Sequence, residues 1–77
     1  MNYDLAMMAL EGIRKSPIEV TVAKGEITIA ANAGSLKDLA RLCLLLGGNN
    51  AGDGDGFDLQ PGVHVAKNAP AVKLRLK

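Results

Sequence analysis

The sequence predicts a domain of mixed α and β structure, in which an N-terminal helix precedes a ββαββ unit. The chain has 77 residues, so residues 1–77 are expected to form one domain. Apolar residues recur with a helical period in two segments and alternate with polar residues in the others. Proline and glycine separate these segments. We therefore expect an α+β two-layer sandwich of helices on one antiparallel four-stranded sheet.

Residues 3–14 predict a short amphipathic helix. The segment is rich in leucine, methionine and alanine, which favour helices. Ser16-Pro17 ends it, because proline disfavours helical geometry in the residue before it. The expected apolar face is formed by Leu5, Ala6, Ala9, Leu10 and Ile13.

Residues 18–31 predict a β-hairpin around the two-residue loop Lys24-Gly25. Apolar residues alternate with polar ones on both sides of the loop. The resulting register pairs Val20 with Ile29, Thr21 with Thr28 and Val22 with Ile27. Because apolar residues then meet on one face, we expect that face to be buried.

Ser35 is the expected N-cap of a second helix, and Asp38 completes a variant of the capping box. Gly47-Gly48 is expected to end this helix, and residues 49–56 are expected to form a polar loop. The predicted buried stripe consists of Leu36, Leu39, Ala40, Cys43 and Leu46.

Residues 62–66 and 71–76 predict a second hairpin around residues 67–70. The expected pairs are Val63 with Leu74, His64 with Lys73, and Val65 with Val72. An all-antiparallel sheet allows the strand orders 2-1-3-4 and 1-2-4-3. Basic residues at alternate positions of the last strand suit a sheet edge, which favours 2-1-3-4. The expected core is Val20, Val22, Ile27, Ile29, Leu36, Leu39, Cys43, Val63, Val65, Val72 and Leu74.

Composition limits the classes of function. Aromatic residues make up 3% of the chain, which argues against recognition of nucleic acid by base stacking. The formal net charge is +1, whereas proteins that track phosphates carry clustered positive charge. We therefore expect no nucleic-acid partner.

Cysteine use and apolar patterning predict a cytoplasmic protein. Cys43 is the only cysteine, so neither an internal disulfide nor a cysteine metal cluster is possible, as is typical of a reducing compartment. The N-terminal segment lacks the basic region of a signal peptide. The longest apolar run, Leu42 to Leu46, is too short to span a bilayer.

The aspartate-rich segment from Asp53 to Asp58 raises the possibility of calcium binding. Alignment of Gly56 with the sixth position of an EF-hand loop leaves Ala51 and Gly62 where ligands are required. We therefore expect a solvated loop and no cofactor, with a small-ligand or calcium binder as the second alternative function.

The sequence predicts no enzyme. His64 is the only histidine, and no serine, threonine or cysteine stands in a nucleophile motif that would use it as a base. Cys43 is expected to pack as a small apolar residue. A polar sheet face with Glu19, Glu26, His64 and Lys73 is the second-choice surface for an interaction.

The first-choice interaction surface lies on the leucine-rich helix. Leu44 and Leu45 turn toward the side that carries Arg41, which a two-layer domain leaves in water. Either the N-terminal helix or another chain covers them, and the sequence leaves both open. The candidate surface comprises Arg41, Leu42, Leu44 and Leu45.

Four features follow one another between Ile18 and Leu76. They are Gly25-Glu26-Ile27-Thr28-Ile29, Leu36-Lys37-Asp38-Leu39-Ala40-Arg41-Leu42, Gly62-Val63-His64-Val65 and Val72-Lys73-Leu74. In these features the chain resembles small bacterial immunity proteins associated with polymorphic toxins. The resemblance implies non-catalytic binding of a protein partner. The leading expectation is thus a protein-binding module, and its first alternative is a self-associating homodimer.

Overall fold

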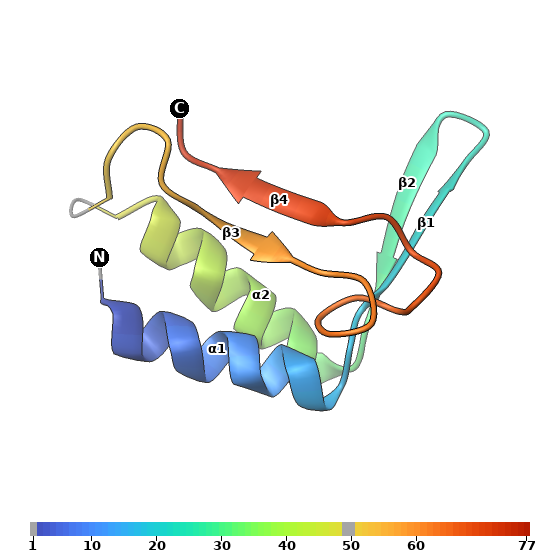
Figure 1. The fold of residues 1–77 in the computed structure, drawn as a ribbon, viewed down its shortest axis with the longest axis horizontal. Helices are drawn as coiled ribbons and strands as arrows, with labels where there is room; N and C mark the ends of the chain where they lie inside the picture. The colour runs from blue at the N-terminus through green and yellow to red at the C-terminus, as the bar shows by residue number, and fades with distance from the viewer. Residues whose placement is uncertain (1, 49–50) are drawn as a thin grey trace.

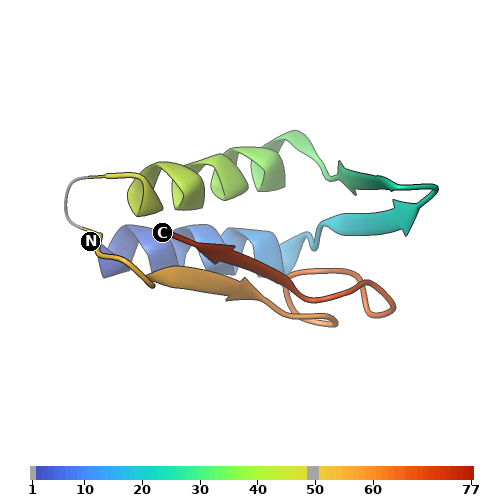
Figure 2. The same cartoon turned by 90° about the horizontal axis from the view of Figure 1, so that it is seen from above.

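The computed structural model describes residues 2–48 and 51–77. In these residues, two helices lie side by side, a small sheet packs against them, and a hairpin projects from one end (Figures 1 and 2). The elements in chain order are α1 (Tyr3–Lys15), β1 (Glu19–Ala23), β2 (Glu26–Ala30), α2 (Ala33–Leu46), β3 (Gly56–Leu59) and β4 (Val72–Arg75). Neither described helix combines the length and the apolarity that crossing a bilayer requires.

Helix α1 forms where its composition predicts. The Asn2 side chain caps its start by accepting a hydrogen bond from the Leu5 N–H at 3.1 Å. Ala6, Ala9 and Ile13 are buried against the rest of the chain. Leu5 was expected on the same face, but it is exposed at the edge of the contact with α2.

Helices α1 and α2 run in opposite directions as a helical hairpin (Figure 1). Gly12 lies at their contact, where an added Cβ atom would meet the Asp38 carboxylate and that side chain would have to move. Glycine inside a helix costs about 1 kcal/mol relative to alanine. Here its missing side chain leaves room for the Asp38 carboxylate of the second helix.

Helix α2 begins two residues earlier than predicted. Asn32 is its N-cap, and the Asn32 side chain accepts a hydrogen bond from the Ser35 N–H at 2.8 Å. Ser35 was predicted as the cap, but it lies buried in the first turn and donates its hydroxyl to the Ser16 carbonyl at 2.6 Å. The expected capping box was therefore wrong, and Asp38 instead pairs with Arg41 at 2.7 Å.

The buried side of α2 is rotated from the predicted stripe. Leu42 and Leu46 are buried, and Leu39 and Leu45 are half-buried against the core. Leu36 and Cys43 were expected in the core and are exposed. The reason is that α1 packs directly on α2, so the buried side turns toward the first helix.

The register of the first hairpin is confirmed. Val20 lies opposite Ile29, Thr21 opposite Thr28, and Val22 opposite Ile27. The turn has positive φ at both central residues, 55° at Lys24 and 76° at Gly25. This is the type I′ geometry that suits a two-residue hairpin loop.

The predicted burial of that hairpin was wrong. Val20 is buried, but Val22 is 62% exposed, Ile27 is 71% exposed and Ile29 is 43% exposed. The hairpin replaces the turn between two helices that pack on each other, so it extends beyond them (Figure 2). Little of its apolar face therefore contacts the rest of the domain.

For the second predicted hairpin, the C-terminal strand forms as expected but pairs with a different segment. Strand β4 pairs with β3, which places Phe57 opposite Leu74 and Leu59 opposite Val72. Residues 62–66 were expected to be that partner, but Gly62 has a φ of 79°, and the segment turns back toward its own start. Val65 instead forms isolated parallel bridges with Ile18 and Pro61.

The α+β class is therefore confirmed, and the single four-stranded sheet is wrong. The described residues form two separate antiparallel pairs, β1–β2 and β3–β4, and the order 2-1-3-4 does not occur. Val20 and Val65 are buried as expected, while Leu39, Val63, Val72 and Leu74 are half-buried. The buried core consists of Ala6, Ala9, Ile13, Ile18, Val20, Leu42, Leu46, Phe57, Leu59 and Val65.

Substitution Leu42→Ala tests this core. Leu42 is fully buried, so its truncation should lower the free energy of unfolding by about 2–5 kcal/mol. Leu44→Ala is the matched control, because Leu44 lies two residues away and is 75% exposed. Denaturant unfolding measures both, and equal losses would contradict the packing of α2 on α1.

Candidate interaction surface

His64 belongs to a tight turn and not to a strand. Its Nδ1 accepts a hydrogen bond from the Gln60 N–H at 3.2 Å, which requires the neutral ring. Partial burial lowers the pKa of His64, and the nearby charge of Arg14 lowers it further, while Glu11 opposes the shift. The histidine therefore organises the turn that leads to Val65.

The residues of the second-choice surface do not lie together on one face. Glu19 and Glu26 share the polar face of the β1–β2 hairpin, because Glu19 is opposite Ala30 and Glu26 is opposite Ala23. His64 lies in the turn, and Lys73 lies on β4 opposite Asp58. These four residues were expected on one sheet face, and the division into two sheets separates them.

The aspartate segment uses its carboxylates locally. Asp55 accepts a hydrogen bond from the Gly52 N–H at 2.8 Å, and Asp58 pairs with Arg75 at 2.6 Å. Within residues 2–48 and 51–77, no group of three or more potential ligands among His, Cys, Asp and Glu is placed to hold a metal ion. Asn49 and Asn50 of the predicted loop lie outside the described residues.

The first-choice surface is only partly exposed, because Arg41 and Leu44 are exposed while Leu42 and Leu45 are not. Leu42 is fully buried, so it is not available to a partner. Leu45 is half-buried, and Leu44 remains exposed. A shallow depression of ≈ 340 Å³ is lined by Leu5, Arg41, Leu44 and Leu45. Of the three leucines that suggested a partner here, Leu42 thus belongs to the core, Leu45 packs partly against it, and Leu44 remains exposed.

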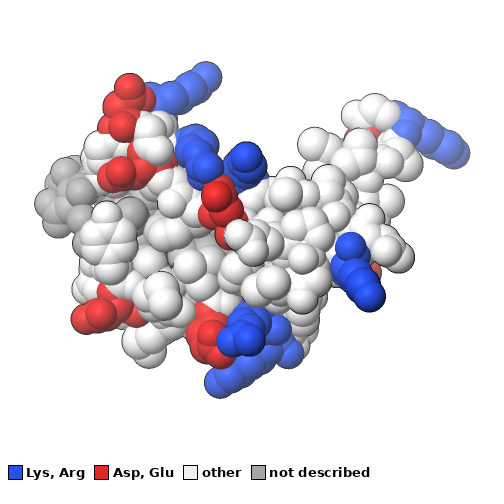
Figure 3. Space-filling view, viewed as in Figure 1, with Lys and Arg blue, Asp and Glu red and all other residues white. Residues whose placement is uncertain are grey.

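The hairpin carries the apolar surface that the sequence did not reveal. We call Val22, Ile27 and Ile29 the hairpin face, because they project from one side of β1–β2 and are exposed. On the side seen in Figure 3, this hairpin is mostly uncharged, with a basic side chain at its free end. The sequence feature that could have predicted this exposure is the shortness of the connections at residues 16–18 and 31–32. They leave the hairpin no room to fold back, so it projects from between the two helices.

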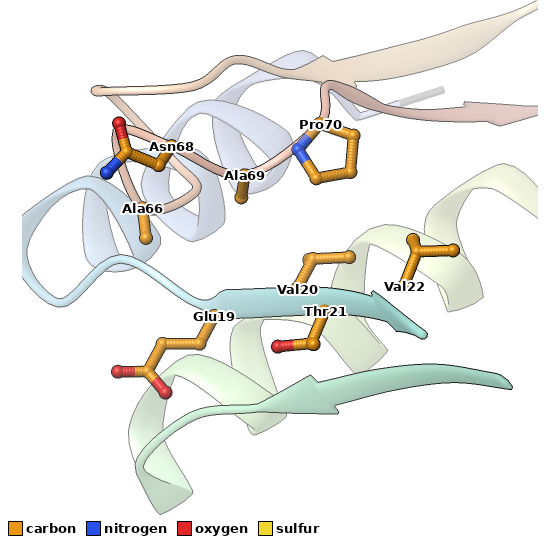
Figure 4. Close-up of a pocket in the computed structure, with 8 residues that line it drawn as sticks. All are labelled: Glu19, Val20, Thr21, Val22, Ala66, Asn68, Ala69 and Pro70. Carbon is orange, nitrogen blue, oxygen red and sulfur yellow. The ribbon is translucent and has the colours of Figure 1, made fainter. Parts of the chain in front are cut away.

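An open groove follows the outer edge of β1. Its volume is ≈ 580 Å³, and it lies between β1 and residues 66–70. Figure 4 shows Val20 and Val22 on one side of the strand and Glu19 and Thr21 on the other. The edge is occupied at one point, because Ile18 exchanges hydrogen bonds with the His64 carbonyl and the Ala66 N–H at 3.0 and 2.9 Å.

Helix α2 also keeps an uncovered apolar stripe. Leu36, Ala40 and Cys43 lie one or two turns apart and are all exposed. Cys43 was expected to be buried, and the rotation of α2 toward α1 leaves it at the surface. A groove of ≈ 360 Å³ separates this side of α2 from β4.

Comparisons of this chain with protein-family models, with curated proteins and with solved structures gave no match. The resemblance to immunity proteins therefore stays a prediction. Any inference about function has to come from the surfaces described above.

The pKa of His64 predicts a change of stability with pH. An unfolded chain has the ordinary histidine pKa of 6.5, so below this value it binds a proton more readily than the folded chain. The contribution of neutral His64 is complete above about pH 6.5 and is lost as the pH falls through the lowered pKa. Thermal unfolding between pH 7.5 and 5.5 measures the loss.

His64→Asn is the control for that measurement. Asparagine keeps an acceptor for the Gln60 N–H but does not titrate. The variant should therefore lose most of the change in melting temperature over this pH range. An unchanged pH dependence would show that another group is responsible.

A calcium titration tests the aspartate segment. Because Asp55 and Asp58 are engaged in local contacts, millimolar calcium should leave the melting temperature unchanged. A specific site would raise it in proportion to its occupancy. A rise with calcium that magnesium does not reproduce would support the calcium alternative.

Proposed function

We propose that this chain is a non-enzymatic cytoplasmic module that binds another polypeptide through the hairpin face. The observation that carries the proposal is the exposure of Val22, Ile27 and Ile29 on a hairpin that projects from the body. Full burial of an aliphatic side chain of this size contributes about 1.5–3 kcal/mol. A partner that covers the hairpin face would gain the part of this contribution that corresponds to the surface each side chain still exposes.

The construction of the hairpin supports the proposal. A two-stranded hairpin is marginally stable in water without packing on one face. In this protein the base of the hairpin is anchored by buried Ile18 and Val20, while its outer half is exposed. Uncovered apolar surface on a small protein commonly marks an interaction site.

The polar groups favour binding over catalysis. His64 accepts a hydrogen bond within its own turn, and Asp55 and Asp58 make the local contacts described above. Catalysis by a base and a nucleophile needs such groups to be aimed at a shared point. The immunity-like form of the proposal names a toxin as the partner, and its support is the resemblance of sequence pattern.

The double variant Ile27→Asp, Ile29→Asp tests the proposed function. It should abolish recovery of bound polypeptides when the tagged chain is cross-linked in native cells, because two carboxylates replace the apolar contacts. The control is Thr21→Asp, Thr28→Asp, which adds the same charge on the opposite face of the same hairpin.

All four positions are exposed, so neither variant removes a buried contact within one chain, and circular dichroism checks that both remain folded. Cross-linked material is quantified by mass spectrometry. Equal recovery with the two variants, or loss with the control alone, would reject the hairpin face as the binding surface.

A further inference from the structure

The sheet β3–β4 stops short of covering α2. The inward-facing residues of β4, Val72 and Leu74, are only half-buried. Beyond them lies the groove toward α2, lined in part by Cys43 and Leu46. A strand added to the free edge of β4 would lie over this groove and over the exposed stripe of Leu36, Ala40 and Cys43.

Backbone hydrogen bonds on the free edge of β4 are available. The Leu76 N–H donates to the Asp55 carbonyl at 2.9 Å, so the backbone groups of Leu76 face β3. Hydrogen-bonding direction alternates along a strand, and the groups of Lys73 and Arg75 therefore face away from β3. Among the described residues, no strand pairs with β4 on that side.

Strand β2 has a free edge as well. In a hairpin with a two-residue loop, the residues that flank the loop exchange hydrogen bonds. Ala23 and Glu26 are those residues, so the backbone groups of Ile27 and Ile29 point outward. The described part of the chain places no strand beside them.

The two free edges match in one orientation. A parallel pairing of β2 with β4 places outward-bonding Ile27 or Ile29 beside Leu74, with the apolar side chains on one face. An antiparallel pairing would place an isoleucine opposite Lys73 or Arg75 on that face. Only the parallel arrangement puts the hairpin face on α2.

Charge favours the same arrangement. On β2, the strand that would pair, the polar face carries Glu26, and the polar face of β4 carries Lys73 and Arg75. With Ile27 beside Leu74, Glu26 lies next to Lys73. Parallel pairing puts these faces on the same side of the enlarged sheet. Opposite charges on neighbouring strands are favourable, and Arg75 already tolerates a carboxylate partner in Asp58.

The hairpin of the same chain does not occupy this position. It is connected to α2 by Ala31 and Asn32 and projects from the end of the molecule where α2 begins (Figures 1 and 2). The groove lies near the other end of α2, at Cys43, Leu46 and Gly47. The β1 edge is less suited than β2, because it already bonds Ala66 and is flanked by residues 66–70. A second copy supplies the missing hairpin with its β2 edge free.

We infer that two copies of this chain form a symmetric dimer in which β2 of each copy adds in parallel to β4 of the other. Each copy then has a sheet in the order β3-β4-β2-β1, with the last two strands donated by the partner. The hairpin face packs on Leu36, Ala40 and Cys43, and the two contacts are identical by a two-fold axis. This inference rests on the proposed function and names its partner.

Light scattering on the purified full chain is the first test. The expected mass is twice the 8.0 kDa of one chain. Ile27→Asp, Ile29→Asp should halve that mass, whereas Thr21→Asp, Thr28→Asp should leave a dimer. A wild-type monomer at millimolar concentration, or a dimer that survives the isoleucine substitutions, overturns the inference.

The β4 edge is tested separately with Lys73→Pro, which removes one outward N–H. Proline is tolerated on an edge strand where its missing N–H faces solvent, so the monomer should stay folded. Lys73→Ala is the control that loses the side chain and keeps the N–H. The inference requires a monomer with proline and a dimer with alanine, and a dimer with both contradicts it.

The single cysteine gives a direct measure of the contact. In the variant Ile29→Cys, oxidation should join the new thiol to Cys43 of the other copy, because both lie on the face between the hairpin and α2. Thr28→Cys places the thiol on the opposite face and should yield little of this cross-link. Peptide mapping identifies the bond, and equal yields from the two variants would reject the arrangement.

The outcomes separate this inference from the proposed function. A wild-type monomer whose isoleucine variant loses cross-linked polypeptides in cells would overturn the dimer and support a different protein partner. If the variant loses neither cellular cross-links nor dimer mass, the hairpin face has no binding role, and both proposals fail.

Discussion

Hydrogen bonds between the end of α1 and the start of α2 determine how the other elements lie. The Ser35 hydroxyl donates to the Ser16 carbonyl at 2.6 Å, and the Asn32 side-chain amide donates to the Ser16 hydroxyl at 3.0 Å. Ser35 is only 2% exposed, and a buried hydroxyl without a partner costs about 1–3 kcal/mol. This junction therefore holds the two helices together at the point where the hairpin leaves them.

Local structure was predictable wherever short-range chemistry decides it. The Lys24-Gly25 turn and the register of β1–β2 follow from alternation and from the loop length. Helix α1 follows from its composition and from the proline after it. The start of α2 was missed because Asn32 and Ser35 are both good caps, and only the contact of Ser35 with Ser16 decides between them.

Long-range pairing was less predictable from one sequence. Residues 56–59 and 62–66 both alternate, and both could have paired with β4. The larger side chains of Phe57 and Leu59 fill the core, and the positive φ of Gly62 turns the competing segment away. The candidate surface on Leu42, Leu44 and Leu45 depended in the same way on where α1 would pack, which a helical wheel of α2 does not show.

The hairpin is attached to the rest of the domain only at its base, so its exposed surface and the stability of the buried core depend on different residues. Most of the described core lies in the helices and in β3, and the hairpin contributes Ile18 and Val20 at its base. Two residues added to each strand near the tip would lengthen the hairpin and keep the apolar and polar residues on their own faces. One residue added to each strand would move the side chains beyond it to the other face. The hairpin can thus diverge in length and sequence while the helical body retains its stability.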